Sequence, residues 1–260
     1  MIINRTAAAL TVIVLGAAAT AEAQTRPVTR PAPRPAARTD RIFVSINGAY
    51  QIGGEDFGET VTFRENAEDG RFSTDYSVKS GPAFNISAGG LVWQRLAVGV
   101  GVSRFSHSTP TVLTASVPHP FFFNQPRAVT GDIGGLTREE LAVHVQARVM
   151  IPVSTRIQAM VFGGPSFFHV KQGIVNDFEI TEAYPYDVVT FSRGVTSSVS
   201  KSKVGFNLGA DVSYFFNRRL GVGGMAQYAG TTIDVPSAGS GTIEVKAGGF
   251  QVGGGLRLRF

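Results

Sequence analysis

The sequence predicts an all-β fold, an eight-stranded antiparallel up-and-down β-barrel with short turns at one end and long loops at the other. Eight stretches alternate apolar and polar residues with the period of two that a β-strand shows. The connections between these stretches alternate between short and long. The chain contains 31 Gly and 19 Phe and no Cys, which excludes disulfides, thiolate metal sites and a cysteine nucleophile.

The N-terminal 40 residues predict export rather than a folded element. Residues 1–23 combine a basic start, an apolar run and an A-x-A sequence, which is the pattern of a secretory signal peptide cleaved between Ala23 and Gln24. Residues 24–40 are rich in Pro and Arg and predict an extended periplasmic linker, either a solvated spacer or a basic strap against anionic cell-wall or lipid groups. The barrel is expected over residues 41–260.

The net charge of +5 does not indicate a nucleic-acid-binding protein. Much of the excess positive charge lies in the linker, and the export signal directs the chain away from nucleic acid.

The predicted strands follow from the alternation, which is clearest in the fourth. There Leu141, Val143 and Val145 share one face while His144 and Gln146 share the other. The expected strands cover residues 42–52, 83–93, 96–106, 139–151, 156–170, 203–216, 220–232 and 246–260. The expected long loops are 53–82, 107–138, 171–202 and 233–245, and all of them fall at the end opposite the termini.

The orientation of the two faces separates a membrane barrel from a soluble one. A lipocalin-like barrel would turn the apolar face inward around a ligand. Here the polar face carries charged and ionisable residues that a small-ligand cavity would rarely contain, and these predict an ion-pair network inside a transmembrane barrel: Glu140, His144, Arg148, Asp211, Arg257 and Arg259.

Strand length and aromatic placement favour the same orientation. Strands of about 11 residues, tilted by about 40°, match an apolar band of about 25 Å. Aromatic residues near the strand ends predict two interfacial girdles: Trp93, Tyr214, Phe215, Phe216 and Phe260 at the turn end, and Tyr50, Phe105, Phe167, Phe168 and Tyr228 toward the loops.

From Ile42 onward the chain resembles the small eight-stranded outer-membrane barrels, namely the OmpA transmembrane domain, OmpX and the opacity-type surface proteins. The resemblance implies a monomer in the outer membrane of a Gram-negative-type bacterium, in contact with outer-membrane lipid and lipopolysaccharide. It also implies that Phe260 is the C-terminal signal for the barrel-assembly machinery. Eight strands leave an interior just wide enough for side chains.

The expected role is structural or surface-interaction, in the manner of an adhesin, without catalysis, cofactor or metal. Phe121, Phe122 and Phe123 form an apolar run inside a predicted loop and are the candidate contact site for an extracellular ligand. The alternative for this run is burial over the barrel mouth or between loops.

Two other functions remain open at this stage, a narrow pore and an enzyme that modifies lipid A or phospholipid. Ser106, His107 and Ser108 lie near the outer end of a strand, but adjacent residues face opposite sides of a strand. The His-x-Ser spacing of lipid A deacylases is absent, because Thr109 stands two positions after His107.

Overall fold

The computed structural model describes residues 41–53, 56–236 and 241–260. Residues 1–23, with the Ala23–Gln24 cleavage site, and the linker 24–40 lie outside the described residues. No helix in the described part combines the length and apolar composition that a membrane-spanning helix needs. The described strands are β1 (Ile42–Ile52), β2 (Asp56–Glu65), β3 (Glu68–Ser77), β4 (Gly81–Trp93), β5 (Leu96–Val117), β6 (Arg127–Pro152), β7 (Ile157–Glu182), β8 (Val189–Phe215), β9 (Leu220–Pro236) and β10 (Thr242–Arg259).

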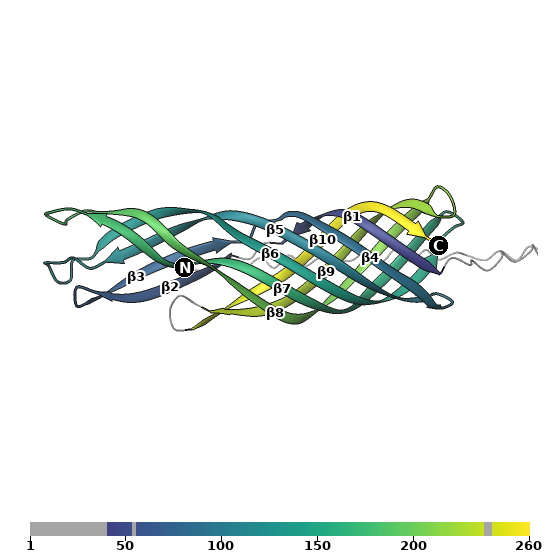
Figure 1. The fold of residues 1–260 in the computed structure, drawn as a ribbon, viewed down its shortest axis with the longest axis horizontal. Coiled ribbons are helices and arrows are strands. Elements are labelled where there is room, and N and C mark those ends of the chain that lie inside the picture. Colours follow the sequence, from purple (N-terminus) through teal and green to yellow (C-terminus); the bar gives the residue numbers. More distant parts are fainter. Residues whose placement is uncertain (1–40, 54–55, 237–240) are drawn as a thin grey trace, which may run out of the picture. The chain divides into compact units, whose positions relative to one another are not determined.

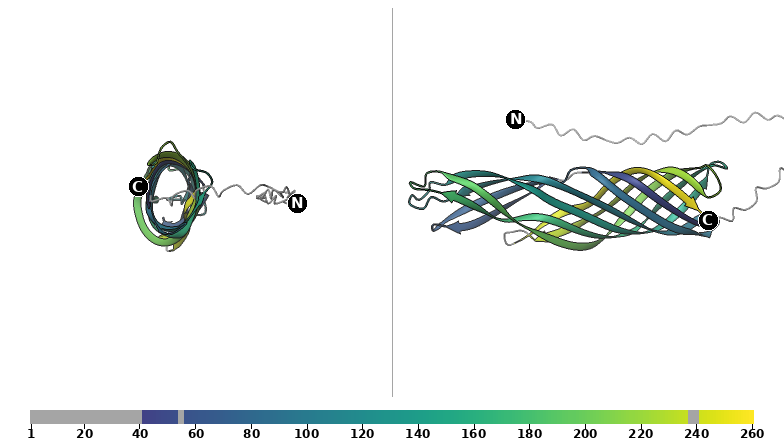
Figure 2. Two further views of the ribbon diagram at one scale, coloured as in Figure 1. Left: turned by 90° about the vertical axis from the view of Figure 1, so that its right-hand side faces the viewer. Right: turned by 45° about the horizontal axis from the view of Figure 1, so that its top comes forward.

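Eight of these strands form a closed antiparallel ring, as predicted (Figures 1 and 2). β1 pairs with β4 on one side and with β10 on the other, and the pairing of β5 with β6 completes the circuit. The two ends of the ring meet through mutual backbone hydrogen bonds of Ile42 and Phe260, at 3.0 and 2.8 Å. The remaining strands, β2 and β3, form a hairpin that joins the outer part of β5.

Four strands are much longer than predicted. β5, β6, β7 and β8 contain 22, 26, 26 and 27 residues. At about 3.3 Å per residue and a tilt of about 40°, the longest rises about 68 Å, well beyond a band of about 25 Å. The predicted loops 107–138 and 171–202 are therefore mostly strand, and only residues 118–126 and 183–188 connect strands there. The predicted loop 53–82 is mostly the β2–β3 hairpin.

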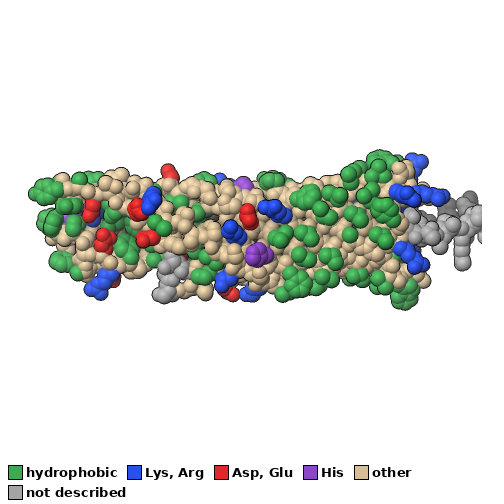
Figure 3. All heavy atoms as spheres, viewed as in Figure 1, with side chains coloured by type: hydrophobic (Ala, Val, Ile, Leu, Met, Phe, Trp, Pro, Cys, Tyr) green, Lys and Arg blue, Asp and Glu red, His purple; other side chains and the backbone are tan. Residues whose placement is uncertain are grey.

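The polarity of the two faces inverts along each long strand. In the lower part of β5, Leu96, Val98 and Val100 are exposed on the outside, as predicted. Farther up the same strand, Leu113 and Val117 point inward and are fully buried. The strand keeps its alternation, but the apolar residues move from the outer to the inner face. Figure 3 shows the result as a surface covered by hydrophobic side chains near the C-terminus and by mixed polar side chains beyond it.

The inversion divides the barrel into two parts. We call the exposed apolar zone near the C-terminus the apolar band, and we call the upper part of the strands, residues 56–77, 107–138 and 171–202, the extension. In the extension, β6 and β7 part above the Arg138–Gln172 pair. The sheet β2–β3–β5–β6 and the β7–β8 ribbon then share an apolar core that includes Phe72, Leu113 and Val175.

Most of the aromatic residues predicted to lie on the outer face do so, but the prediction is wrong for three of them. Phe105, Phe168 and Phe215 are buried inside the barrel. Each of them is one position out of phase with the apolar outer face, so its side chain points inward. The other predicted members are exposed: Tyr50, Trp93, Phe167, Tyr214, Phe216, Tyr228 and Phe260.

Candidate functional site

The charged residues predicted for the barrel interior are all buried there, but only two of them pair with each other. Asp211 and Arg257 form a salt bridge through Oδ2 and Nη2, and Arg257 Nε also donates to Asp211 Oδ1 at 3.2 Å. Ser213 donates to Asp211 Oδ1 at 2.6 Å, and Arg257 donates to Asn47 Oδ1 at 2.6 Å. These bonds give the carboxylate and the guanidinium the partners that buried charges need.

Glu140 pairs with a residue outside the predicted set. Arg138 Nε donates to Glu140 Oε1 at 2.6 Å, and both side chains are buried. Gly248 N donates to Glu140 Oε2 at 2.9 Å, while Arg138 Nη2 donates to the Lys246 carbonyl at 2.6 Å. The predicted loop 107–138 ends on Arg138, although this residue stands two positions before Glu140 and so shares its face.

His144 and Arg148 are held by neutral partners. The two ring nitrogens of His144 lie 2.9 Å from Ser103 Oγ and 2.7 Å from Ser166 Oγ. Arg148 donates to Gln146 Oε1 at 2.5 Å, and its guanidinium lies over the Phe43 ring, 4.8 Å from the centroid. Both ring nitrogens of His144 thus have partners, as in a packed core residue, whereas Arg148 Nε is buried without a hydrogen-bond partner.

Arg259, the last of the predicted interior residues, lies at the turn end of the barrel. It donates through Nε to the Arg218 carbonyl at 2.6 Å, and its guanidinium lies 3.8 Å from the centroid of the Phe215 ring. The inward position of Phe215 thus supplies a cation–π partner for this arginine.

The Phe121–Phe123 run forms the outermost end of the β5–β6 hairpin. Phe121, Phe122 and Phe123 are 64%, 53% and 70% exposed, so they do not fold over the barrel mouth or pack between loops. Tyr184 and Val188 of the neighbouring β7–β8 connection are also exposed, and Phe121 makes an edge-on contact with Tyr186 at 5.4 Å. We call Phe121–Phe123 together with Tyr184, Tyr186 and Val188 the aromatic tip. Figure 3 shows hydrophobic side chains gathered at this end of the molecule.

Two buried residues hold the aromatic tip in place. His119 Nδ1 accepts hydrogen bonds from the backbone N–H groups of Phe121 and Phe122, at 3.1 and 3.2 Å. Arg127 donates to the Pro118 and Tyr186 carbonyls at 2.8 and 2.9 Å and to Glu182 at 2.5 Å. Arg127 therefore links the β5–β6 and β7–β8 connections, and these hydrogen bonds fix the backbone that carries the exposed rings.

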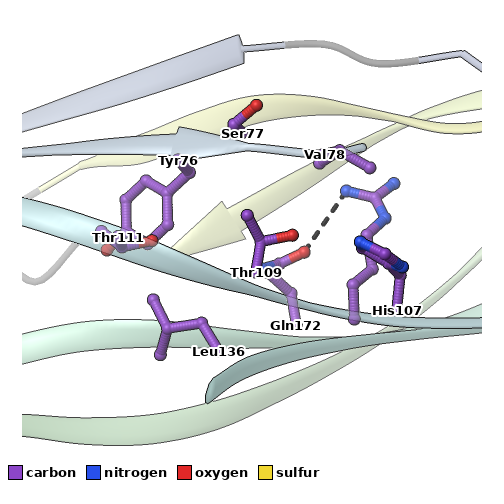
Figure 4. A pocket seen from close by; sticks show the side chains of 9 residues that line it. Tyr76, Ser77, Val78, His107, Thr109, Thr111, Leu136 and Gln172 are labelled. Carbon is purple, nitrogen blue, oxygen red and sulfur yellow. Dashed lines mark hydrogen bonds between the residues drawn. The ribbon is translucent and has the colours of Figure 1, made fainter. Parts of the chain in front are cut away.

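The Ser106–His107–Ser108 stretch contains no serine–histidine contact. His107 stacks on Phe105 and lines a cavity of about 10 Å³ with Thr109 and Gln172 (Figure 4). Ser108 instead hydrogen-bonds Thr137 at 2.8 Å. Room for about one water is too little for a lipid chain.

Sequence reasoning missed a different serine–histidine pair. His169 on β7 and Ser202 on β8 are register partners, and His169 Nδ1 lies 2.9 Å from Ser202 Oγ on the exposed surface. They lie just above the exposed Phe167 of the apolar band. Because the two residues are 33 positions apart, no spacing in the sequence indicates the pair. Across the described ranges, no three His, Asp or Glu side chains are grouped to hold a metal ion.

Comparison with known proteins finds similarity only at the level of three-dimensional structure. No protein-family model and no curated protein matches the chain. The outer membrane protein OprG of Pseudomonas aeruginosa is 10% identical with a TM-score of 0.45, over 86% of this chain and 97% of OprG. Neisserial surface protein A is 11% identical with a TM-score of 0.41, over 84% of this chain and 97% of that one. The outer membrane protease OmpT of Escherichia coli is 8% identical with a TM-score of 0.43, over 85% and 97%. The structural neighbours are thus outer-membrane β-barrel proteins of differing activity, and no function passes from them to this chain.

Proposed function

We propose that this protein is an outer-membrane β-barrel of a Gram-negative-type bacterium with a structural or surface-interaction role, and that the aromatic tip is its contact site. The apolar band supports the membrane position. Exposed Val, Leu and Phe side chains cover the outer surface of the closed ring there, with aromatic residues at both edges. Such a surface is stable against acyl chains and costly in water.

The aromatic tip carries the proposal. Three consecutive exposed Phe side chains lie at the far end of strands that continue well beyond the apolar band. Aromatic anchors on a preorganised surface lose little conformational entropy on binding and often dominate an interface. The tip therefore fits an apolar depression on an extracellular macromolecule.

Adhesion of a tip variant tests this role. The full-length barrel in lipid nanodiscs is applied to immobilised laminin, fibronectin and collagen, and retained protein is measured. Replacing Phe121, Phe122 and Phe123 together with alanine is expected to reduce retention at least about ten-fold, since each lost anchor weakens an interface measurably. A control with Thr114→Ala, Ser192→Ala and Ser200→Ala removes exposed polar side chains from the extension and leaves the tip intact. Equal retention of both variants, or no retention of the native protein by any of the three probes, would overturn the adhesive role.

Hydrolysis of an outer-leaflet lipid ester is a second candidate function, favoured by the exposed His169–Ser202 pair. A histidine within hydrogen-bond distance of a serine can act as its general base. Mass spectrometry of lipid A and phospholipids from cells with and without the protein measures this activity. If cells with the native protein have a lipid that lacks one acyl chain, and cells with Ser202→Ala do not, the activity is supported. If the lipids are the same with and without the protein, the activity is excluded.

A further inference from the structure

An arginine directly precedes each of the four strands that run from the turn end of the barrel toward the extension. Arg41, Arg95, Arg156 and Arg219 stand immediately before β1, β5, β7 and β9. These strands alternate with β4, β6, β8 and β10 around the closed ring, so an arginine recurs at every second strand. Arg218 stands beside Arg219 in the same turn, and all five residues are exposed. We call these five residues the arginine ring.

Backbone hydrogen bonds fix the arginine ring at the rim of the barrel. The carbonyls of Arg41 and Arg95 accept hydrogen bonds from β4 and β6, both at 2.7 Å. The carbonyls of Arg156 and Arg219 accept in the same way from β8 and β10, at 2.8 and 2.9 Å. Four equivalent backbone bonds therefore set the positions from which these side chains extend.

The arginine ring concentrates positive charge at an end that lacks acidic side chains among the described residues. None of the five arginines forms an ion pair within that part of the chain. The described acidic side chain closest to this end is Asp211, which is buried and paired with Arg257. The terminal carboxylate of Phe260 offsets at most one of the five charges. Figure 3 shows basic and no acidic side chains at this end, on the face that it draws. Such a concentration of one sign of charge attracts anions.

The arginine ring borders the apolar band. An exposed hydrophobic residue follows directly after each of the four arginines that precede a strand, namely Ile42, Leu96, Ile157 and Leu220. Because successive residues alternate faces, these arginines start from the inner side of the rim, where the wall ends and their side chains are exposed. Arg156 Nη1 lies 3.4 Å from the hydroxyl of Tyr214, an exposed aromatic residue of the band, so this guanidinium reaches the outer surface. Long basic side chains beside an apolar surface extend their charge into the headgroup layer.

We propose that the arginine ring binds the phosphate groups of anionic phospholipids in the membrane leaflet at the turn end. Guanidinium groups form strong charge-assisted hydrogen bonds with phosphate oxygens, and basic residues at a membrane surface favour anionic headgroups. The acyl chains of the bound lipids lie along the exposed hydrophobic residues that follow the arginines. The proposal rests on the outer-membrane position proposed above, in which this leaflet consists of phospholipid, and it is independent of the aromatic tip.

Titration with two lipids tests the arginine ring. The full-length protein is refolded in neutral detergent micelles and titrated with phosphatidylglycerol and with zwitterionic phosphatidylcholine, and bound lipid is counted by native mass spectrometry. In the test variant all five arginines of the ring are replaced by glutamine, which removes the charge and keeps the backbone bonds. Its affinity for phosphatidylglycerol is expected to fall about five-fold at each lipid site, from about 1 kcal/mol per basic residue, while its affinity for phosphatidylcholine is unchanged.

A control variant has the same net charge as the test variant and keeps the arginine ring. It replaces five exposed basic residues elsewhere and is expected to bind both lipids as the native protein does: Arg64→Gln, Arg71→Gln, Lys79→Gln, Lys171→Gln and Lys201→Gln. Residues 24–40 are the same in all three proteins, so a difference between them does not come from the basic linker.

Several outcomes separate the arginine ring from its premise. Equal weakening in the test and control variants, or equal affinity of the native protein for the two lipids, overturns the lipid site. Phosphatidylglycerol binding by the native protein that is unchanged at high salt also overturns it, because exposed charges are screened. Capture of the native protein but not the test variant by purified peptidoglycan, without a preference between the lipids, assigns the ring to the cell wall instead. Failure of the native barrel to insert into phospholipid vesicles refutes the membrane position, whereas insertion with a phosphatidylglycerol preference that depends on the ring supports both.

Discussion

Replacing Asp211 with leucine is expected to destabilise the barrel by about 3–5 kcal/mol. Asp211 and Arg257 are 4% and 3% exposed, and the carboxylate accepts two hydrogen bonds from the guanidinium. Without it, Arg257 keeps only the neutral acceptors Asn47 Oδ1 and the Leu256 carbonyl, at 2.6 and 3.0 Å. The loss is therefore the cost of leaving a buried charge without its counter-charge.

A second variant distinguishes this reasoning from simple loss of packing. In Asp211→Leu/Arg257→Met both charges of the pair are replaced by apolar side chains, so neither partner is left as an unpaired charge. Because exchanging a buried ion pair for apolar residues is often nearly neutral, the double variant is expected to recover most of the loss. The exposed pair Lys203–Asp234 is the control, and Asp234→Leu is expected to cost less than about 1 kcal/mol.

Equilibrium unfolding by urea from lipid vesicles measures these free energies. Trp93 is the only tryptophan of the chain and is exposed at the lower edge of the apolar band, so its fluorescence reports transfer from lipid to water. The reasoning is refuted if Asp211→Leu costs less than about 1 kcal/mol, or if the double variant costs as much as the single variants Asp211→Leu and Arg257→Met added together.

Three further predictions concern other parts of the barrel. Arg138→Met leaves buried Glu140 without its counter-charge and is expected to lower the free energy of unfolding by about 3–5 kcal/mol in the same assay. A variant as stable as the native protein would contradict this prediction. Burial raises the pKa of Tyr76, so the unfolded chain loses the phenolic proton at a lower pH than the folded protein does. The contribution of Tyr76 to the free energy of unfolding is therefore fully present below about pH 10 and decreases as the pH rises further. Tyr76→Phe should remove this part of the alkaline dependence in unfolding measured across pH 8–12, and an unchanged dependence would argue against it. Gly255→Val places a side chain against a carbonyl of β1 and is expected to prevent ring closure, seen as loss of the heat-dependent gel shift, whereas Gly241→Val meets open space and should fold.

The amino-acid sequence determined the ring of strands and the outer face of its lower part. The predicted limits of the first strand, 42–52, coincide with those of β1. This success has a physical reason, because a strand with lipid on one side and a polar core on the other repeats every two residues, and that period is visible without any partner strand.

The same rule failed where the surroundings of the strand changed. In β5 the apolar positions shift from Leu96 and Val98 to Leu113 and Val117, which reverses the faces. Because the apolar face of the lower strand ends at this reversal, the sequence pattern predicts loops where the extension is strand. The β-bulges between Thr109 and Thr111 and between Val175 and Asp177 also interrupt the period.

Only the tertiary structure decided which residues meet. Asp211 and Arg257 are 46 positions apart, and His169 and Ser202 are 33 apart, so each contact depends on strand register across the ring. The exposure of Phe121–Phe123 likewise depends on His119 and Arg127, which fix the turn from inside. Alternation within one strand selects a face, whereas pairing between strands sets the height of each side chain, and a contact requires both.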